Sequence, residues 1–380
     1  MTKNSMVHII LILFLIISLN IKLYAADFKG NLDCKSAVLM EASTGKVLYE
    51  KNANEVLPPA SVTKIMTLLL VMEAIDNGKI SLNDMVTVSD YAASMGGSQV
   101  FLKAGETMSV DEMLKCVVIS SANDCAVALA EFLYGSEDAF VAAMNARAKE
   151  LGMNNTNFEN TNGLDDTATN HVTSAMDIAI MSRELIKHTL ILKYSSTWMD
   201  TIRNGSFGLT TTNRLVRFYS GANGLKTGST SKALFCISAT AKRDNMQLIA
   251  VIMAAPTRDI RNAEAKKLLD FGFANFGIFT IKENTLLPIQ VKGGISDICE
   301  LKSPEINIVI EKEKFSSIIT KNELPESINA PVCIGDKIGR IVLEHNEKEI
   351  FSSEIISTEE IPAISFLGVL FKTIKSFCIS

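Results

Sequence analysis

The stretch Pro58-Pro59-Ala60-Ser61-Val62-Thr63-Lys64, followed at once by Ile65-Met66-Thr67-Leu68-Leu69-Leu70-Val71-Met72, decides how this part of the chain folds. Residues before proline disfavour the helical conformation, so the Pro58-Pro59-Ala60 segment ends an extended piece of chain. Apolar side chains then recur at helical spacing as far as Asn77-Gly78, at Ile65, Leu68, Leu69, Met72 and Ile75. The pattern predicts a helix with Ser61 at its N-terminus.

Ser61 and Lys64 are three residues apart, which places them on one helix face. The first-turn amides of a helix lack partners and carry partial positive charge, so they can stabilise an oxyanion that forms beside Ser61. A neutral Lys64 could take the hydroxyl proton, and burial or a second cation would keep it neutral. Taken alone, the pair also fits an ordinary N-cap serine and a solvated lysine.

Two further motifs follow in the chain. Ser121-Ala122-Asn123 interrupts two apolar helical patterns, at 113–119 and 125–134, so its polar side chains lie on a connection between helices. Lys226-Thr227-Gly228-Ser229 precedes predicted strands at 233–240 and 247–253 and would open a sheet strand. There Lys226 offers a fixed positive charge, Thr227 a hydroxyl, and Gly228 room for close approach. The order of the three motifs is that of penicillin-binding proteins and class A β-lactamases.

Composition limits the other classes of function. With 380 residues the chain is long enough for two domains. A formal net charge of −5 without a basic block argues against a nucleic-acid partner. Seven scattered cysteines and four histidines show no metal-ligand spacing, so we expect no metal and no cofactor. Buried thiols are expected at Cys116, Cys125 and Cys236, with one disulfide bridge as the alternative.

The chain divides into four predicted segments. Residues 1–26 read as a secretory signal peptide, with an apolar core at 7–17, although an uncleaved anchor remains an alternative. Residues 27–280 hold the motifs, and 281–357 show the short period-2 runs of a small β domain. Residues 358–380 form an amphipathic helix that is expected to lie on a membrane surface, or else to pack on the β domain.

Several other elements are predicted around the motifs. Strands are expected at 36–40 and 46–50, and a capping box at Ser109 is expected to start a helix over 112–119. A helix over 257–276 carries Arg261 near its start. His171 precedes another helix, and as a lone histidine it fits a structural hydrogen-bonding role better than that of a general base.

With these motifs in view, the chain resembles the D-alanyl-D-alanine carboxypeptidases, the low-molecular-mass penicillin-binding proteins of bacterial cell-wall synthesis. The resemblance covers nearly the whole chain and includes Asn162-Gly163-Leu164, the segment 171–177 and the segment 261–269. It implies an α+β/α/β penicillin-binding (β-lactamase-like transpeptidase) domain with an antiparallel sheet flanked by helices. A small all-β domain and a C-terminal amphipathic helix would follow.

The resemblance also implies a mechanism. Ser61 would attack the carbonyl between the two terminal D-alanines of a peptidoglycan stem peptide and form an acyl-enzyme. Lys64 would be the base, and Ser121 and Asn123 would relay protons and orient Lys64 and the substrate. The amides of Ser61 and Ser229 would form the oxyanion hole, while Lys226, Thr227 and Arg261 would bind the terminal carboxylate beside Gly228. β-Lactam antibiotics would acylate the same serine, and the enzyme would work outside the cytoplasm at the outer face of the cytoplasmic membrane.

Two rival functions remain open at the level of sequence. A serine β-lactamase shares the three motifs, and Glu159-Asn160-Thr161-Asn162 supplies a superficial Glu-x-x-Asn, although Thr161 stands where that family has leucine. A non-hydrolytic penicillin-binding or wall-sensing module would acylate slowly and then signal. Turnover of a stem peptide distinguishes the carboxypeptidase from both.

Overall fold

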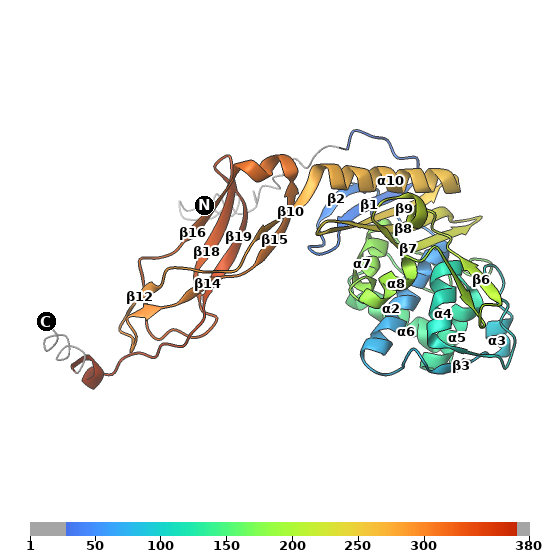
Figure 1. Cartoon of the computed structure of the whole chain (residues 1–380), viewed down its shortest axis with the longest axis horizontal. Helices are drawn as coiled ribbons and strands as arrows, with labels where there is room; N and C mark the ends of the chain where they lie inside the picture. Colours follow the sequence, from blue (N-terminus) through green and yellow to red (C-terminus); the bar gives the residue numbers. More distant parts are fainter. Residues whose placement is uncertain (1–27, 371–380) are drawn as a thin grey trace, which may run out of the picture. The chain divides into compact units, whose positions relative to one another are not determined.

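A five-stranded antiparallel sheet organises the part of the chain that carries the motifs (Figure 1). The computed structural model describes residues 28–370, so the predicted signal peptide and the end of the predicted C-terminal helix lie outside the described residues. The strand order is β2-β1-β9-β8-β7. The strands are β1 (Ser36–Glu41), β2 (Val47–Lys51), β7 (Ala222–Thr230), β8 (Leu234–Arg243) and β9 (Met246–Ala255).

Helices cover both faces of this sheet (Figure 1). Helix α10 (Arg258–Asn275) packs on one face against β9, β8 and β1, while α7 (Ala175–Leu185) and α2 (Lys64–Asp76) pack on the other. Because β9 is covered on both sides, it is apolar and buried along nearly its whole length. The sheet therefore provides a rigid base for the segments that carry the motifs.

The remaining helices and two short ribbons build a second, mostly helical layer. Its helices are α3 (Asp90–Ala93), α4 (Val110–Lys115), the π-helical turn η2 (Cys116–Ser120), α5 (Asn123–Tyr134), α6 (Glu137–Glu150), α8 (Thr189–Ser195) and α9 (Leu215–Phe218). The ribbons pair β3 (Met85–Thr87) with β4 (Thr107–Ser109), and β5 (Met199–Ile202) with β6 (Phe207–Thr210).

Two local predictions need correction in this layer. Ser109 does cap its helix, accepting from the Glu112 N–H at 3.2 Å, but the helix begins at Val110 and widens into the π-helical turn after Lys115. Lys226 does not open a strand, because β7 begins four residues earlier, at Ala222. The motif thus lies in the middle of the edge strand, where its backbone can face a ligand.

The rest of the described chain is a β-rich unit with its own apolar core. Its strands are β10 (Phe276–Ile281), β11 (Asn284–Thr285), β12 (Ile289–Lys292), β13 (Ile298–Cys299), β14 (Leu301–Ser303), β15 (Ile306–Glu311), β16 (Ile318–Glu323), β17 (Ser327–Asn329), β18 (Lys337–His345) and β19 (Lys348–Ser357), with a 3₁₀ segment η3 (Lys312–Ser317). Alternating buried residues of these strands form the core. The predicted fold class is confirmed.

The described cysteines are free thiols. Five of the six described cysteines are buried free thiols, including Cys116, Cys125 and Cys236, whereas Cys333 is exposed and Cys378 lies outside the described residues. Between residues 28 and 370, no helix combines the length and apolarity that a membrane crossing requires.

Candidate active site

The segment around Ser61 differs from a simple helix start. Residues Ala60–Thr63 form a 3₁₀ turn, η1, and α2 begins only at Lys64. Ala60 has a φ of 48°, in the left-handed region that residues with a side chain rarely adopt. The chain therefore changes direction immediately before Ser61, and Ser61 stands on the tight turn that leads into α2.

The Lys64 side chain is fully buried, with 0% exposure, and three acceptors surround its amine. Lys64 Nζ lies 3.1 Å from Ser61 Oγ, 2.6 Å from Asn123 Oδ1 and 2.8 Å from the Asn162 carbonyl oxygen. Asn123 Nδ2 donates to the Gly96 carbonyl at 2.7 Å, which fixes the amide with its oxygen toward Lys64. A neutral amine has two N–H bonds, and these two oxygens accept them, so its lone pair is left for the Ser61 hydroxyl.

Burial and then the nearby Lys226 ammonium lower the pKa of Lys64 well below its usual value, while Asp124 opposes them. A lysine with a lowered pKa can serve as a base. The sequence analysis expected burial or a second cation to keep Lys64 neutral, and the structure contains both. Asn162 was missed as a site residue, because it contributes a backbone carbonyl that no side-chain motif reveals.

Ser121 reaches the same site from the break between η2 and α5. Its φ is 63°, and neither it nor Asn123 acts as an N-cap, because Ala122 holds that position without a side-chain bond. Lys226 Nζ donates to Ser121 Oγ at 2.8 Å and to the Thr227 carbonyl at 2.9 Å. The three motifs thus converge in two hydrogen-bonded pairs, Lys64 with Ser61 and Lys226 with Ser121.

Lys226 differs from the fixed positive charge that the sequence suggested. Its side chain is 1% exposed, and burial followed by the charge of Arg261 lowers its pKa to about 7. Near neutral pH the amine is therefore divided between its charged and neutral forms. An anion bound nearby would favour the charged form and raise this pKa.

A surface cavity of about 440 Å³ opens over these groups. Its lining residues are Ser61, Ser98, Ser121, Trp198, Thr210, Thr211, Thr212, Arg214, Thr227, Gly228, Ser229, Arg258 and Arg261. The backbone of β7 forms one wall close to the serine. A Cβ on Gly228 would lie 2.8 Å from the Pro59 oxygen and 2.9 Å from the nitrogens of Ser61 and Val62, which explains why glycine stands there.

Three arginines line one end of this cavity, which we call its positive end. Arg214, Arg258 and Arg261 line it together, and Arg261 is almost completely buried. Burial and then the charge of Arg258 lower the pKa of Arg261 to about 10. Within residues 28–370, no carboxylate forms a salt bridge with Arg261. The site thus offers buried positive charge to an anionic ligand. Arg214 and Arg258 were missed by the sequence analysis, although Arg258 precedes Arg261 by one helical turn.

Two residues weighed from the sequence lie outside the cavity. Glu159 is exposed, and its carboxylate accepts from the backbone N–H groups of Thr169 and Asn170 at 2.8 and 3.0 Å. The Glu159 carboxylate is therefore bound to backbone groups at the surface and does not line the cavity over Ser61, so it does not fit the role of a deacylating base. His171 is buried and bonds to Thr63, in agreement with the structural role.

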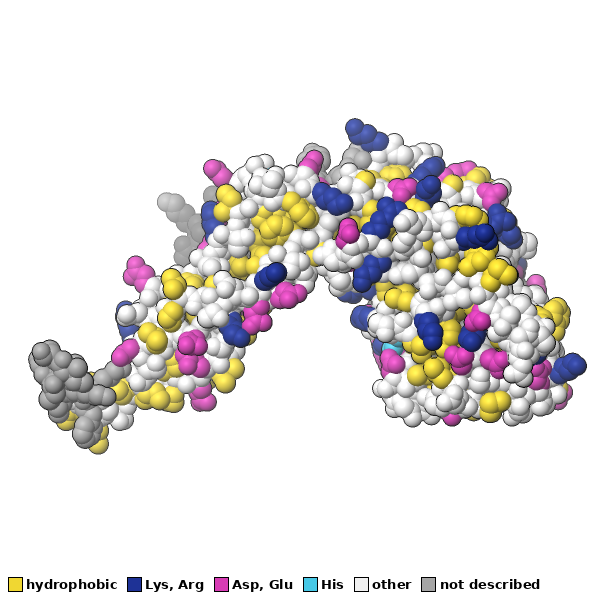
Figure 2. Space-filling model, in the orientation of Figure 1, with side chains coloured by type: hydrophobic (Ala, Val, Ile, Leu, Met, Phe, Trp, Pro, Cys, Tyr) yellow, Lys and Arg dark blue, Asp and Glu magenta, His cyan; other side chains and the backbone are white. Residues whose placement is uncertain are grey.

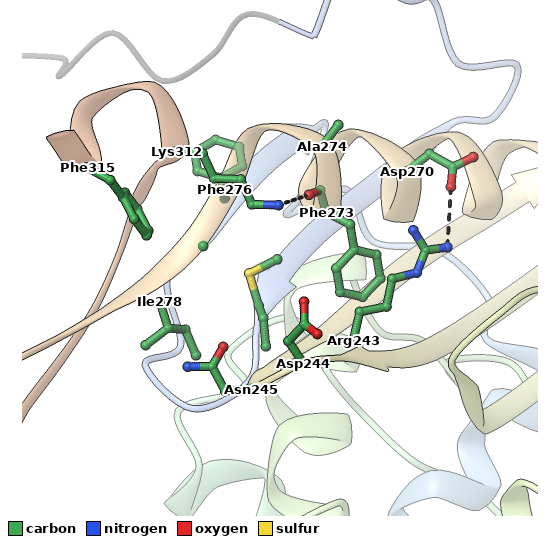
Figure 3. Close-up of a pocket in the computed structure, with 12 residues that line it drawn as sticks. Arg243, Asp244, Asn245, Asp270, Phe273, Ala274, Phe276, Ile278, Lys312 and Phe315 are labelled. Carbon is green, nitrogen blue, oxygen red and sulfur yellow. Dashed lines mark hydrogen bonds and ion pairs between the residues drawn. The ribbon is translucent and has the colours of Figure 1, made fainter.

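A larger cavity of about 590 Å³ lies elsewhere, at the end of α10 and the turn between β8 and β9 (Figure 3). Its cations already have partners, since Arg243 lies 3.7 Å from Asp270 and Lys312 donates to the Phe273 carbonyl at 2.6 Å. None of the motif residues lines it. The smaller cavity over Ser61 is therefore the candidate active site.

Comparison with known proteins agrees with this assignment. The family described as D-alanyl-D-alanine carboxypeptidase matches residues 24–257, and the C-terminal domain of penicillin-binding protein 5 matches residues 282–363. The chain is 44% identical to the D-alanyl-D-alanine carboxypeptidase DacF of Bacillus subtilis (strain 168) over 348 residues, which cover 90% of this chain and 89% of DacF.

Solved structures give the same result. Penicillin-binding protein 5 from Haemophilus influenzae superposes with a TM-score of 0.80 at 33% identity, covering 88% of this chain and 98% of that one. Penicillin-binding protein D2 from Listeria monocytogenes in its ampicillin-bound form gives a TM-score of 0.59 at 33% identity, over 64% of this chain and 98% of that one. The function predicted from the three motifs is confirmed: the chain belongs to the D-alanyl-D-alanine carboxypeptidases, the serine peptidases of peptidoglycan that are also low-molecular-mass penicillin-binding proteins.

Proposed function

We propose that Ser61 is the nucleophile of this carboxypeptidase and that neutral Lys64 is its general base. The observation that carries this proposal is the 3.1 Å approach of Lys64 Nζ to Ser61 Oγ, while Asn123 and Asn162 hold the other sides of the amine. Lys64 takes the hydroxyl proton as Ser61 Oγ attacks the carbonyl carbon between the two terminal D-alanines. Collapse of the tetrahedral intermediate breaks the C–N bond and leaves an acyl group on Ser61.

Ser121 delivers a proton to the leaving amine in this scheme. Lys226 donates to its oxygen at 2.8 Å, so the hydroxyl hydrogen of Ser121 remains free to point into the cavity. Once the hydrogen passes to the departing D-alanine nitrogen, Ser121 is replenished by the proton that Lys64 took from Ser61, so Lys64 returns to its neutral form. Water then attacks the ester carbonyl, and Lys64 takes a proton from the water and passes it to Ser61 Oγ as the ester bond breaks, so that the shortened peptide leaves.

The backbone amides of Ser61 and Ser229 are proposed as the oxyanion hole. The tight approach of β7 to the Ser61 turn at Gly228 supports this role, because it brings the two backbones together. Each amide in such a site contributes about 3 kcal/mol to transition-state stabilisation in comparable enzymes.

The positive end of the cavity is proposed to bind the terminal carboxylate of the stem peptide. Arg261 and the charged form of Lys226 provide the cations, and Thr227 and Ser229 provide hydroxyls on the same wall. A substrate without a free carboxylate would leave these buried cations unpaired, which favours cleavage at the chain end. β-Lactams, which carry a carboxylate and an acylating carbonyl, bind at the same place.

Trapping the acyl-enzyme tests the catalytic assignment. We expect benzylpenicillin to add one adduct to the intact mass of the protein and peptide mapping to place it on Ser61. Ser61→Ala should carry no adduct, and Asn275→Ala, at the far end of α10, should label like the wild type. An adduct on another residue, or one that persists in Ser61→Ala, overturns the assignment.

The enzyme is extracytoplasmic, and we propose that it is exported by a signal peptide at 1–26 and held at the outer face of the cytoplasmic membrane. The proposed segments are the catalytic domain at 27–280, the β domain at 281–357 and a C-terminal anchor at 358–380. The prediction of a helix over the whole anchor is wrong for its first part, because residues 358–365 are not helical and pair with the β domain, and the described helix begins only at residue 366. Figure 2 shows hydrophobic side chains at the surface of the β-rich part, and the helical residues before 371 include Phe366 at 85% and Leu367 at 64% exposure. Lys372 and Lys375 follow in the sequence and suit anionic headgroups.

The anchor is tied to the β domain by its backbone. Gly294 and Ala363 form a bridge, Ile364 N–H donates to the Gly293 carbonyl at 2.8 Å, and Ile361 pairs with Val332. These bonds fix where the helix leaves the domain. The exposed apolar residues beyond them are therefore presented to a lipid surface from a fixed position.

A further inference from the structure

A chain of directed hydrogen bonds runs from His171 to the residue before the nucleophile. His171 Nε2 lies 2.7 Å from Thr63 Oγ1, and Thr63 Oγ1 donates to the Ala60 carbonyl oxygen at 2.8 Å. Thr63 is fully buried, and His171 is 6% exposed. Neither residue lines the cavity over Ser61, so this chain lies behind the reacting atoms.

The direction of each bond follows from the far side of the imidazole ring. The Glu159 backbone N–H donates to His171 Nδ1 at 3.0 Å, so Nδ1 accepts and carries no proton. In the neutral ring the proton therefore resides on Nε2 and is donated to Thr63 Oγ1. Since Thr63 accepts this proton, its own hydroxyl hydrogen is directed to the Ala60 carbonyl.

The Ala60 carbonyl is confined from a second side. A Cβ on Gly163 would lie 1.9 Å from the Ala60 oxygen and 2.9 Å from Thr63 Oγ1, so the Gly163 backbone packs directly against both groups. Ala60 holds a φ of 48°, a conformation that costs about 1–2 kcal/mol for a residue with a side chain. Such a conformation persists only where its surroundings impose it.

The backbone near His171 holds the other side of the turn. Leu57 and Thr173 exchange two N–H···O bonds, at 2.8 and 2.9 Å, four residues before Ser61. Residues 171–173 thus contact the chain on both sides of Ser61. The Thr173 backbone bonds to Leu57 before it, and the His171 side chain bonds to Thr63 after it.

We propose that His171 is a positioning residue: its Nε2–H, relayed through the Thr63 hydroxyl, holds the Ala60 carbonyl in place and so aims Ser61 Oγ at the scissile carbonyl. The inference rests on Ser61 being the nucleophile. Because Lys64 makes its own contacts with Asn123 and Asn162, loss of the relay misplaces Ser61 without changing the basicity of Lys64.

Two pairs of variants separate the relay from simple packing. Asparagine places an oxygen where Nδ1 stands but does not reach Thr63, whereas glutamine can place an amide N–H where Nε2 stands. We expect His171→Asn and Thr63→Val to slow penicillin acylation about 10–100-fold, as small misplacements of reacting groups do. His171→Gln and Thr63→Ser should acylate at rates close to that of the wild type.

Thr67→Val is the matched control, since Thr67 is equally buried, lies one turn along α2 and donates to the Thr161 carbonyl at 2.6 Å. It should lower the melting temperature about as much as Thr63→Val while leaving acylation unchanged. The pH profile of acylation should keep its midpoint in every variant. Equal slowing by Thr67→Val and Thr63→Val, or wild-type rates in His171→Asn, overturns the proposal.

The same series distinguishes this inference from the assignment of the nucleophile. If the wild-type adduct maps to a residue other than Ser61, the proposed function fails. If it maps to Ser61 and only the relay variants behave like the wild type, the positioning role alone fails. Should Thr63→Val not fold, the comparison of His171→Asn with His171→Gln still decides.

Discussion

At the scale of single residues, the proposed mechanism depends on which groups surround the Lys64 amine. Asn123 is neutral, and its oxygen accepts from Lys64 without stabilising the charged form as a carboxylate would. Asp124, the next residue, is buried and accepts from the backbone N–H groups of Leu102 and Cys125, and no hydrogen bond joins it to Lys64 among the described residues. The placement of asparagine at position 123 therefore keeps Lys64 available as the proposed base for the Ser61 proton.

Asn123→Asp should reverse this arrangement. A carboxylate 2.6 Å from Lys64 Nζ would stabilise the ammonium and raise the pKa of Lys64. We expect the acylation rate at neutral pH to fall about 10²-fold and to recover as the pH rises. Stopped-flow acylation by a chromogenic β-lactam from pH 6 to 10 measures this. A profile that coincides with that of the wild type would contradict the role of Lys64 as base.

His171 should make stability depend on pH. Burial lowers the pKa of His171 to about 4 from 6.5, with Glu159 and Asp165 opposing and Lys64 adding to the effect. Between these values the unfolded chain binds a proton that the folded chain does not, so stability falls as the pH falls from about 6.5 toward 4 and is level above 6.5. At pH 5 the loss attributable to His171 is about 2 kcal/mol.

The measurement is urea unfolding of the wild type and His171→Gln at pH 7.5 and pH 5. Glutamine does not titrate, so the variant should lose about 2 kcal/mol less than the wild type between the two pH values. Equal losses would show that His171 is protonated to the same degree in the folded and unfolded chains.

At the scale of elements, the sequence predicted what local patterns determine. Helices α2 and α10 and the paired strands β1 with β2 and β8 with β9 follow from apolar periodicity and turn residues. Local patterns did not predict three other features. These are the 3₁₀ turn at Ser61, the π-helical turn before Ser121 and the position of Lys226 within an edge strand. Each of these depends on contacts between distant segments, such as Gly163 against Ala60, which local propensity does not encode.

Gly228→Ala tests the close approach of β7 to the nucleophile turn. A methyl group 2.8–2.9 Å from three backbone atoms would force the strand and the turn apart and widen the proposed oxyanion hole. Loss of one such donor costs about 10²–10³ in rate, and we expect acylation to fall by that factor. Gly208→Ala on β6 is the control, since a Cβ there meets nothing within 4 Å. A Gly228→Ala enzyme as active as Gly208→Ala would contradict this arrangement.

At the scale of the whole molecule, the described chain joins a catalytic α+β part to a β-rich part that ends in an exposed apolar segment. The three motifs predicted the catalytic part, and the period-2 runs predicted the β-rich part. Both parts were predictable because each of these signals extends over many residues. The positive end of the cavity, which is proposed to bind the carboxylate, was only partly predictable, because Arg214, Arg258 and Trp198 come from three different segments.

Removing the C-terminal segment should abolish membrane binding without affecting catalysis. We expect the chain from residue 27 to sediment with vesicles that contain anionic lipid, and more weakly with neutral vesicles or in high salt. A chain that ends at Ile364 keeps the bonds to Gly293 and Val332 and should stay in the supernatant. It should still release D-alanine at the full rate. Vesicle binding by this shortened chain would contradict the proposed anchor.

The most direct test of the central claim is D-alanine release from a synthetic pentapeptide stem by the chain from residue 27, with Ser61→Ala and penicillin-treated samples alongside. We predict release over many turnovers by the untreated enzyme, and none in either of the other two samples. Release that persists in Ser61→Ala, or a protein that reacts with penicillin but leaves the pentapeptide intact, would contradict a serine carboxypeptidase working through Ser61.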